Sequence, residues 1–192
     1  LQPNHPTDNV KGVTASLLEG LSYGAGDAVL GLNPAIDNVK STTDILNLFN
    51  DVKSRLKIPT QICVLSHITT QLKALKSGAP MDLCFQSIAG SEKALASFGT
   101  DVDMLAEANE LMASKGTSIG PNYMYFETGQ GSELSSNSHN GADQLVMESR
   151  CYGLARHYNP FLVNTVVGFI GPEYIYDTKE LIRAALEDNF CG

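Results

Sequence analysis

Apolar and polar positions along this chain follow two patterns, one typical of buried strands and one typical of amphipathic helices. Short runs of consecutive apolar residues predict strands at 27–33, 60–66, 82–88, 122–127 and 161–169, preceded by the end of another strand at residues 1–2. Apolar residues spaced three and four apart predict helices at 13–23, 42–57, 68–77, 91–98, 101–115, 142–158 and 180–190. Strands and helices therefore alternate from end to end, which is the pattern of an α/β fold.

Local signals predict where several of these helices begin and end. Ser41 or Thr42 can cap the helix at 42–57, and Gly78 is placed to act as the C-terminal cap of the helix at 68–77. The helix at 42–57 should bury one apolar stripe, made of Ile45, Leu46, Leu48, Phe49, Val52 and Leu56.

The predicted strands are apolar throughout, so both faces of the sheet must be covered and the strands should be parallel. An open doubly wound sheet and a (β/α)₈ TIM barrel both fit this description. The dinucleotide-binding version of the open sheet needs glycines directly after a strand, whereas Gly24-x-Gly26 precedes a strand and Gly129-x-Gly131 opens a loop. The barrel is therefore favoured. Six strand signals make residues 1–192 the central part of one barrel domain, with two strands expected in a longer parent chain.

Polar residues stand at the ends of the predicted strands, where parallel α/β folds build their active sites. They are Gln2, Asn33, His67, Gln86 and Glu127. A carboxylate at the end of an apolar strand is costly to desolvate unless a partner balances its charge, and a bound cation is one such partner. Position alone leaves Glu127 equally open to a structural salt bridge.

Several residue types that catalysis often uses are absent from the predicted strand ends, and their absence excludes some classes of reaction. No lysine stands there to form a Schiff base, only one acid stands there, and Asn4-His5-Pro6 is not a His-x-His metal motif. His67 suits a ligand or a base, although a hydrogen-bonded structural histidine is the commoner case. Neutral amides with one carboxylate suit a small cationic alcohol or amine, and chemistry in which a cofactor breaks the bonds.

Composition excludes other classes. The net charge is −8 with lysines and arginines scattered, whereas nucleic-acid binding needs a clustered basic face. The longest apolar runs are far shorter than the roughly 20 residues of a membrane-spanning helix. The four cysteines, Cys63, Cys84, Cys151 and Cys191, form no C-x-x-C pair, so we expect reduced core residues without a metal.

Several long blocks of the sequence are distinctive. They are Leu1-Gln-Pro-Asn-His-Pro-Thr-Asp8, Gly20-Leu-Ser-Tyr-Gly-Ala-Gly-Asp27, Gly31-Leu-Asn-Pro34, Pro59-Thr-Gln-Ile-Cys-Val-Leu-Ser-His67, Phe85-Gln-Ser-Ile-Ala-Gly90, Tyr125-Phe-Glu-Thr-Gly-Gln-Gly131, Gly153-Leu-Ala-Arg-His-Tyr158 and Asn164-Thr-Val-Val-Gly-Phe-Ile-Gly-Pro-Glu173. They closely resemble the large subunit of ethanolamine ammonia-lyase, and the resemblance covers essentially the whole chain.

The resemblance implies an adenosylcobalamin-dependent lyase on a TIM barrel, which converts ethanolamine to acetaldehyde and ammonia by radical 1,2-amino migration and elimination. It implies that Glu127 is catalytic and holds the substrate ammonium, with help from Gln2. Gln2 and Asn33 would bind the hydroxyl, and Leu1 belongs to the same substrate-binding set. The implied cobalamin contacts are Pro34, Gln86 and Ser135.

The resemblance also implies a small-subunit partner, a hetero-oligomer with several copies of each subunit, and a cytoplasmic location in a bacterial microcompartment. An Arg expected before Leu1 and an Asp expected after Gly192 lie outside the chain, so the isolated fragment is predicted to be inactive. Two alternatives remain open. One is a non-catalytic barrel that serves as a scaffold for a partner subunit, and the other is a different cobalamin-dependent lyase or mutase acting on a small diol or amino alcohol.

Overall fold

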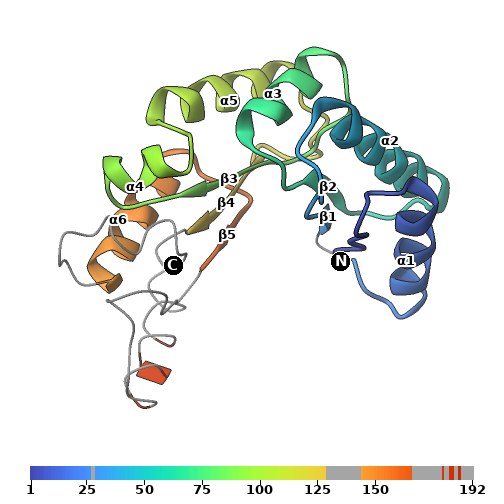
Figure 1. The fold of residues 1–192 in the computed structure, drawn as a ribbon, viewed down its shortest axis with the longest axis horizontal. Helices are drawn as coiled ribbons and strands as arrows, with labels where there is room; N and C mark the ends of the chain where they lie inside the picture. The colour runs from blue at the N-terminus through green and yellow to red at the C-terminus, as the bar shows by residue number, and fades with distance from the viewer. Residues whose placement is uncertain (27–28, 129–143, 166–178, 180–181, 184–185, 187–192) are drawn as a thin grey trace. The chain divides into compact units, whose positions relative to one another are not determined.

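A computed structural model describes residues 1–26, 29–128, 144–165, 179, 182–183 and 186. Helices and strands alternate along the chain (Figure 1) as α1 (Val10–Ser22), β1 (Val29–Leu32), α2 (Val39–Leu56), β2 (Gln61–Val64), α3 (Ile68–Lys76), β3 (Cys84–Ile88), α4 (Glu92–Ser97), α5 (Val102–Lys115), β4 (Met124–Thr128), α6 (Gln144–His157) and β5 (Leu162–Asn164). The chain divides into two compact units. The first contains Leu1–Gln86 and Ala106–Tyr123, and the second contains Ser87–Leu105 and Met124–Gly192.

In the first unit, β1 and β2 form a parallel pair whose register runs from Val29 opposite Gln61 to Leu32 opposite Val64. The backbone of Leu1 continues this pairing on β1. Its N–H group donates to the Val29 carbonyl, and its carbonyl accepts from the Gly31 N–H, both at 2.9 Å. These two bonds follow the pattern of a parallel ladder, in which one residue bonds to both neighbours of its partner. Residue 1 therefore lies beside β1 as the predicted strand end.

Helix α2 packs against β2, with α1 and α3 beside it (Figure 1). The predicted cap at Ser41 or Thr42 is wrong. The helix begins one turn earlier because the side chain of Asn38 accepts a 2.8 Å hydrogen bond from the Ser41 N–H. The predicted stripe is buried at Ile45, Leu46, Phe49 and Val52. The prediction is wrong at Leu56, the last residue of the helix, whose side chain is 54% exposed.

Helix α3 ends at Lys76, and the predicted cap, Gly78, stands one position beyond the observed C-cap. Ser77 is the C-cap, and Gly78 follows it with φ of 90°, in the left-handed region that glycine adopts without steric cost. The buried side chain of Gln71 then joins α3 to the start of β3. Its Nε2 donates to the Phe85 carbonyl at 2.6 Å, and its Oε1 accepts from the Phe85 N–H at 2.9 Å.

A buried carboxylate ties three segments of the first unit together. Asp82 is fully buried and lies 2.5 Å from Lys53 Nζ on α2. It also accepts hydrogen bonds from the Ile62 N–H on β2 at 2.9 Å and from the Thr117 hydroxyl at 2.7 Å. The lysine ammonium and the two hydrogen-bond donors together compensate the buried negative charge of Asp82.

In the second unit, β4 and β5 form a parallel pair, and β3 lies on the other side of β4. Helix α6 packs on β4, where the Phe126 ring lies 5.8 Å from the Tyr158 ring. The approach of α6 requires a glycine at position 90, because a Cβ atom there would lie 2.2 Å from the Met147 carbonyl oxygen. Ser91 is the N-cap of α4, and its side chain accepts from the Ala94 N–H.

The parallel pairs confirm the prediction of an α/β chain with parallel strands. Strand β5 occupies the start of the predicted strand at 161–169, while residues 166–169 and most of the predicted helix at 180–190 lie outside the described residues. Within the described residues, no helix is both long enough and apolar enough to cross a lipid bilayer.

Candidate active site

Gln2 and Asn33 both lie near the end of β1. Because Leu1 is hydrogen-bonded as the partner of Leu30, Gln2 lies level with Gly31, and Asn33 follows two residues further on the same face. Both side chains are exposed. Both neutral amides therefore lie near the end of β1, and their shared role in substrate binding stays a prediction.

Leu1 contributes packing at this position. A Cβ atom placed on Gly20 would lie 2.6 Å from Leu1 Cδ1, so the leucine side chain fills the space above that glycine on α1. The backbone of Leu1 is hydrogen-bonded to Val29 and Gly31 of β1. The substrate-binding role that the resemblance implies for Leu1 stays a prediction.

Two side chains from the segment before α1 accept hydrogen bonds from the backbone of the loop that follows β1. Asn4 Oδ1 accepts from the Asn33 N–H at 2.9 Å, and the carboxylate of Asp8 accepts from the N–H groups of Ala35 and Ile36, each at 2.9 Å. Pro34 lies between these anchors and is half-buried. Asp8 stands before α1 and not at a strand end, and no local sequence pattern connects it with a loop 27 residues later.

His67 and Gln86 both act at the start of α3. His67 is the N-cap, and its Nδ1 accepts from the Thr69 N–H at 3.3 Å. Gln86 was predicted at a strand end, but it is the middle residue of β3, where it is buried and its Oε1 accepts from the Ile68 N–H at 3.1 Å. The structural interpretation of His67 as a hydrogen-bonded histidine is thus confirmed, and Gln86 is held in one orientation by the helix that it caps.

Glu127 lies near the end of β4, on the face opposite α6. Strand residues alternate between faces, and the preceding Phe126 is fully buried against the helix side, so Glu127 points the other way. Partial burial raises the pKa of the Glu127 carboxyl above its usual range. Among residues 1–26, 29–128 and 144–165, no side chain forms an ion pair or a hydrogen bond with this carboxylate.

Asn164 is a neighbour of Glu127 that the strand-end analysis did not include. The two residues are Cα partners on the parallel strands β4 and β5, so their side chains leave the same face about 4.8 Å apart. The predicted strand at 161–169 obscured this neighbour, because it placed Asn164 mid-strand although β5 ends there. Only the register between the two strands reveals the pair.

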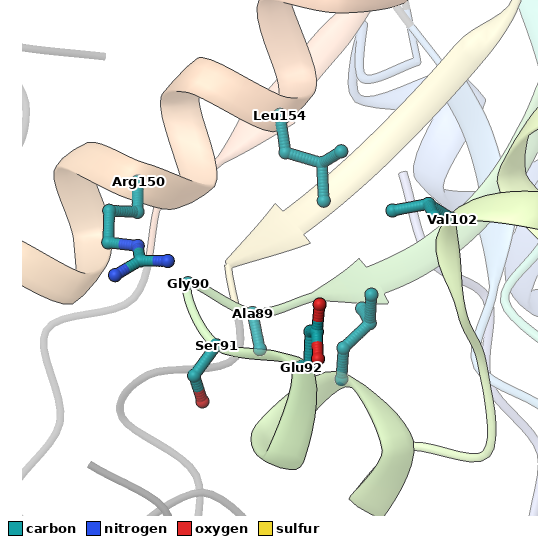
Figure 2. Close-up of a pocket in the computed structure, with 8 residues that line it drawn as sticks. Ala89, Gly90, Ser91, Glu92, Val102, Arg150 and Leu154 are labelled. Atoms are coloured by element: carbon teal, nitrogen blue, oxygen red, sulfur yellow. The ribbon is translucent and has the colours of Figure 1, made fainter. Parts of the chain in front are cut away.

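A separate hollow of about 180 Å³ lies beyond the end of β3 (Figure 2). Its walls are mainly apolar and come from the β3–α4 turn, α4, the start of α5 and α6. Figure 2 shows Leu154 pointing from α6 toward Glu92, and Arg150 on the same helix near Gly90. None of the predicted site residues that the structure describes lines this hollow, so it is treated separately from the candidate active site.

The described cysteines are unsuited to chemistry. Cys63, Cys84 and Cys151 are free and buried, and burial raises the pKa of the Cys63 and Cys84 thiols to about 12. These three confirm the prediction of reduced core residues, while Cys191 lies outside the described residues. In the part of the chain that the structure describes, no three His, Cys, Asp or Glu side chains gather as metal ligands.

Comparison with known proteins decides the family. The family described as "Ethanolamine ammonia lyase large subunit" matches residues 1–192. This chain belongs to the ethanolamine ammonia-lyase large-subunit family. It is 56% identical over 192 residues to the ethanolamine ammonia-lyase large subunit of Salmonella typhimurium strain LT2, and 54% identical to that of Escherichia coli strain K12. Both matches include 100% of this chain but only 42% of the relative.

Family membership confirms the resemblance, and the two relatives are lyases by name. The share of 42% means that more than half of each relative has no counterpart in these 192 residues. Among the predicted cofactor residues, Pro34 and Gln86 are described in the first unit, whereas Ser135 lies outside the described residues.

Proposed function

We propose that this chain is the central part of the large subunit of an adenosylcobalamin-dependent ethanolamine ammonia-lyase, which converts ethanolamine to acetaldehyde and ammonia. The family match over residues 1–192 supports the reaction class. One structural observation supports the substrate, namely the partly buried carboxylate of Glu127 with no partner among the described residues. The proposal assigns the substrate ammonium as that partner.

Glu127 binds the ammonium group through charge and hydrogen bonds. Removing a carboxylate from water is unfavourable, and a cation in contact with it restores much of the lost free energy. Asn164, which leaves the same face of the sheet, offers an amide oxygen to the same ammonium. A carboxylate with a neighbouring amide therefore recognises a protonated amine rather than a neutral alcohol.

Gln2 and Asn33 bind the hydroxyl group of the substrate. A hydroxyl group both donates and accepts hydrogen bonds, and a carboxamide can accept through its oxygen or donate through its NH₂ group without gaining a proton. The two amides share one face at the end of β1, and the Asn33 backbone is fixed by Asn4. These residues therefore orient the substrate and leave its proton in place.

The residues assigned to the cofactor suit a cobalamin chemically. The rim of a corrin ring carries neutral amide chains, and the assigned residues Pro34, Gln86 and Ser135 are uncharged. Gln86 is 4% exposed and fixed by its bond to the Ile68 N–H, so its side chain is ordered before any ligand arrives. When bound, adenosylcobalamin supplies the hydrogen abstraction that no side chain of this set can perform.

The proposal extends to the architecture and the assembly. The parallel pairs β1–β2 and β4–β5 are consistent with part of a TIM barrel, in which strands outside this chain would complete the ring. The large-subunit names of the relatives support a small-subunit partner. We place several copies of each subunit in one hetero-oligomer, and the enzyme in the cytoplasm within a bacterial microcompartment.

Substitution of Glu127→Gln in the full-length large subunit, assembled with its small subunit and adenosylcobalamin, tests the proposal. We expect kcat/KM for ethanolamine to fall at least 30-fold, from the loss of about 2 kcal/mol or more of charge-assisted binding. The matched control is Glu107→Gln, because the Glu107 side chain is 51% exposed and forms an exposed ion pair with Lys76. Equal kcat/KM in both variants would remove Glu127 from the mechanism.

The isolated 192-residue chain should release no acetaldehyde from ethanolamine in the presence of adenosylcobalamin. The family resemblance places an Arg before residue 1 and an Asp after residue 192 in the substrate site, so this segment lacks two groups. Turnover by the isolated segment would contradict that assignment.

A further inference from the structure

We propose that Asp8 is a positioning residue of the active site, whose carboxylate fixes the loop that presents Asn33 and Pro34. This inference rests on the proposed function, because that function gives Asn33 the substrate hydroxyl and Pro34 a cobalamin contact. Asp8 itself touches neither reactant. It acts through the backbone of the loop.

The contacts of Asp8 are those of a loop anchor. Oδ1 accepts from the Ala35 N–H at 2.9 Å, and Oδ2 accepts from the Ile36 N–H at 2.9 Å and from the Ser41 hydroxyl at 3.3 Å. Each carboxylate oxygen therefore holds one backbone amide directly after Pro34. Asp8 is only 8% exposed, so water competes weakly for these bonds.

Among the described residues, no lysine, arginine or histidine forms an ion pair with Asp8. Ser41 lies in the first turn of α2, where unpaired backbone N–H groups and the helix dipole favour a negative charge. Three neutral donors and this dipole compensate the carboxylate. An asparagine would keep one acceptor oxygen but would turn its NH₂ group toward a second N–H donor.

The segment before Asp8 holds it in place. Asp8 has φ of 51°, in the left-handed region that is costly for a residue with a side chain, and its N–H donates to the His5 carbonyl at 3.1 Å. His5 Nδ1 in turn accepts from the N–H groups of Thr7 and Asn9, each at 3.3 Å. The turn around His5 therefore aims the Asp8 carboxylate at a loop 27 residues away.

Asp8→Asn in the holoenzyme is the principal test. We expect KM for ethanolamine and the dissociation constant of cyanocobalamin to rise about tenfold, the usual effect of losing one hydrogen bond to a charged group. The kcat should change by a smaller factor, because the loop acts on binding in the ground state and the transition state alike. Ser41→Ala, which removes only the longest bond, should give a smaller rise in both constants.

Thr117→Val is the matched control, because it removes one hydrogen bond to the other buried carboxylate of the same unit, Asp82. It should lower the melting temperature and leave both binding constants unchanged. If Asp8→Asn behaves like Thr117→Val, Asp8 is merely structural and the inference is wrong. Hydrogen exchange of residues 33–41 should accelerate in Asp8→Asn only, and unchanged exchange there would also contradict the inference.

The design separates this inference from the proposed function. If the unsubstituted holoenzyme turns over ethanolamine and Asp8→Asn does so with the same KM, only the inference on Asp8 fails. If the unsubstituted holoenzyme neither turns over ethanolamine nor binds cyanocobalamin, the proposed function fails, and the inference fails with it.

Discussion

The ion pair between Asp82 and Lys53 should contribute more to stability than any other described ion pair. The Asp82 side chain is fully buried and that of Lys53 is 13% exposed, so neither charge is well hydrated. Asp82→Asn leaves the lysine ammonium without a counter-charge and weakens the bonds to Ile62 and Thr117. Breaking a buried pair in this way costs about 3–5 kcal/mol, which is a large fraction of the stability of a typical domain.

Thermal unfolding of the full-length large subunit, followed by circular dichroism, measures this cost. Asp82→Asn should lower the Tm by several degrees. Asp44→Asn breaks an exposed pair, with side chains 86% and 42% exposed, and should cost at most about 1 kcal/mol. The double variant Asp82→Asn/Lys53→Met should be more stable than the sum of its single substitutions predicts, because no unpaired charge remains. An Asp82→Asn variant as stable as Asp44→Asn would refute this reasoning.

Three further predictions follow from the site and the core. Burial raises the pKa of Glu127, so the ionised form that binds ethanolamine is present at high pH and is lost as the pH falls through that raised pKa. In a pH profile of kcat/KM, the fall on the acid side should therefore occur at a higher pH than an ordinary glutamate would give, and it should disappear in Glu127→Gln. A fall that stays the same in the variant would contradict the assignment. Asn164→Ala should raise KM for ethanolamine about tenfold in a steady-state assay, whereas Val163→Ala, on the opposite face of β5, should not; equal KM values would exclude Asn164 from the site. Cys63, Cys84 and Cys151 should react with a thiol reagent only after denaturation, and rapid labelling of the native enzyme at these positions would show that the core is open.

The pattern of apolar and polar residues predicted the elements well and their contacts poorly. Four of the five described strands fall within a predicted range, and β4 extends one residue beyond its range, to Thr128. Strands β2, β3 and β4 are largely buried, as unbroken apolar runs predict, whereas β5 is largely exposed. Leu56 was assigned to the buried stripe, but the stripe rule ignores that a helix can extend past the surface it packs on. The cap at Asn38 was missed because two adjacent hydroxyl residues gave an equally strong local signal.

The site was only partly predictable for a physical reason. Gln2, Asn33 and Glu127 stand at strand ends, a property that sequence shows directly. Asp8 and Asn164 act through partners 27 and 37 positions away from them, and such pairing depends on how strands and loops come together in space. No local spacing records it.

A comparison of two ligands can decide whether Glu127 binds a cation. The full-length holoenzyme and its Glu127→Gln variant would each be titrated with ethanolamine and with 1,2-ethanediol, its neutral counterpart of similar size. We predict that the native enzyme prefers ethanolamine strongly and that Glu127→Gln loses most of this preference, mainly through weaker binding of ethanolamine. The same preference in both proteins would contradict the account.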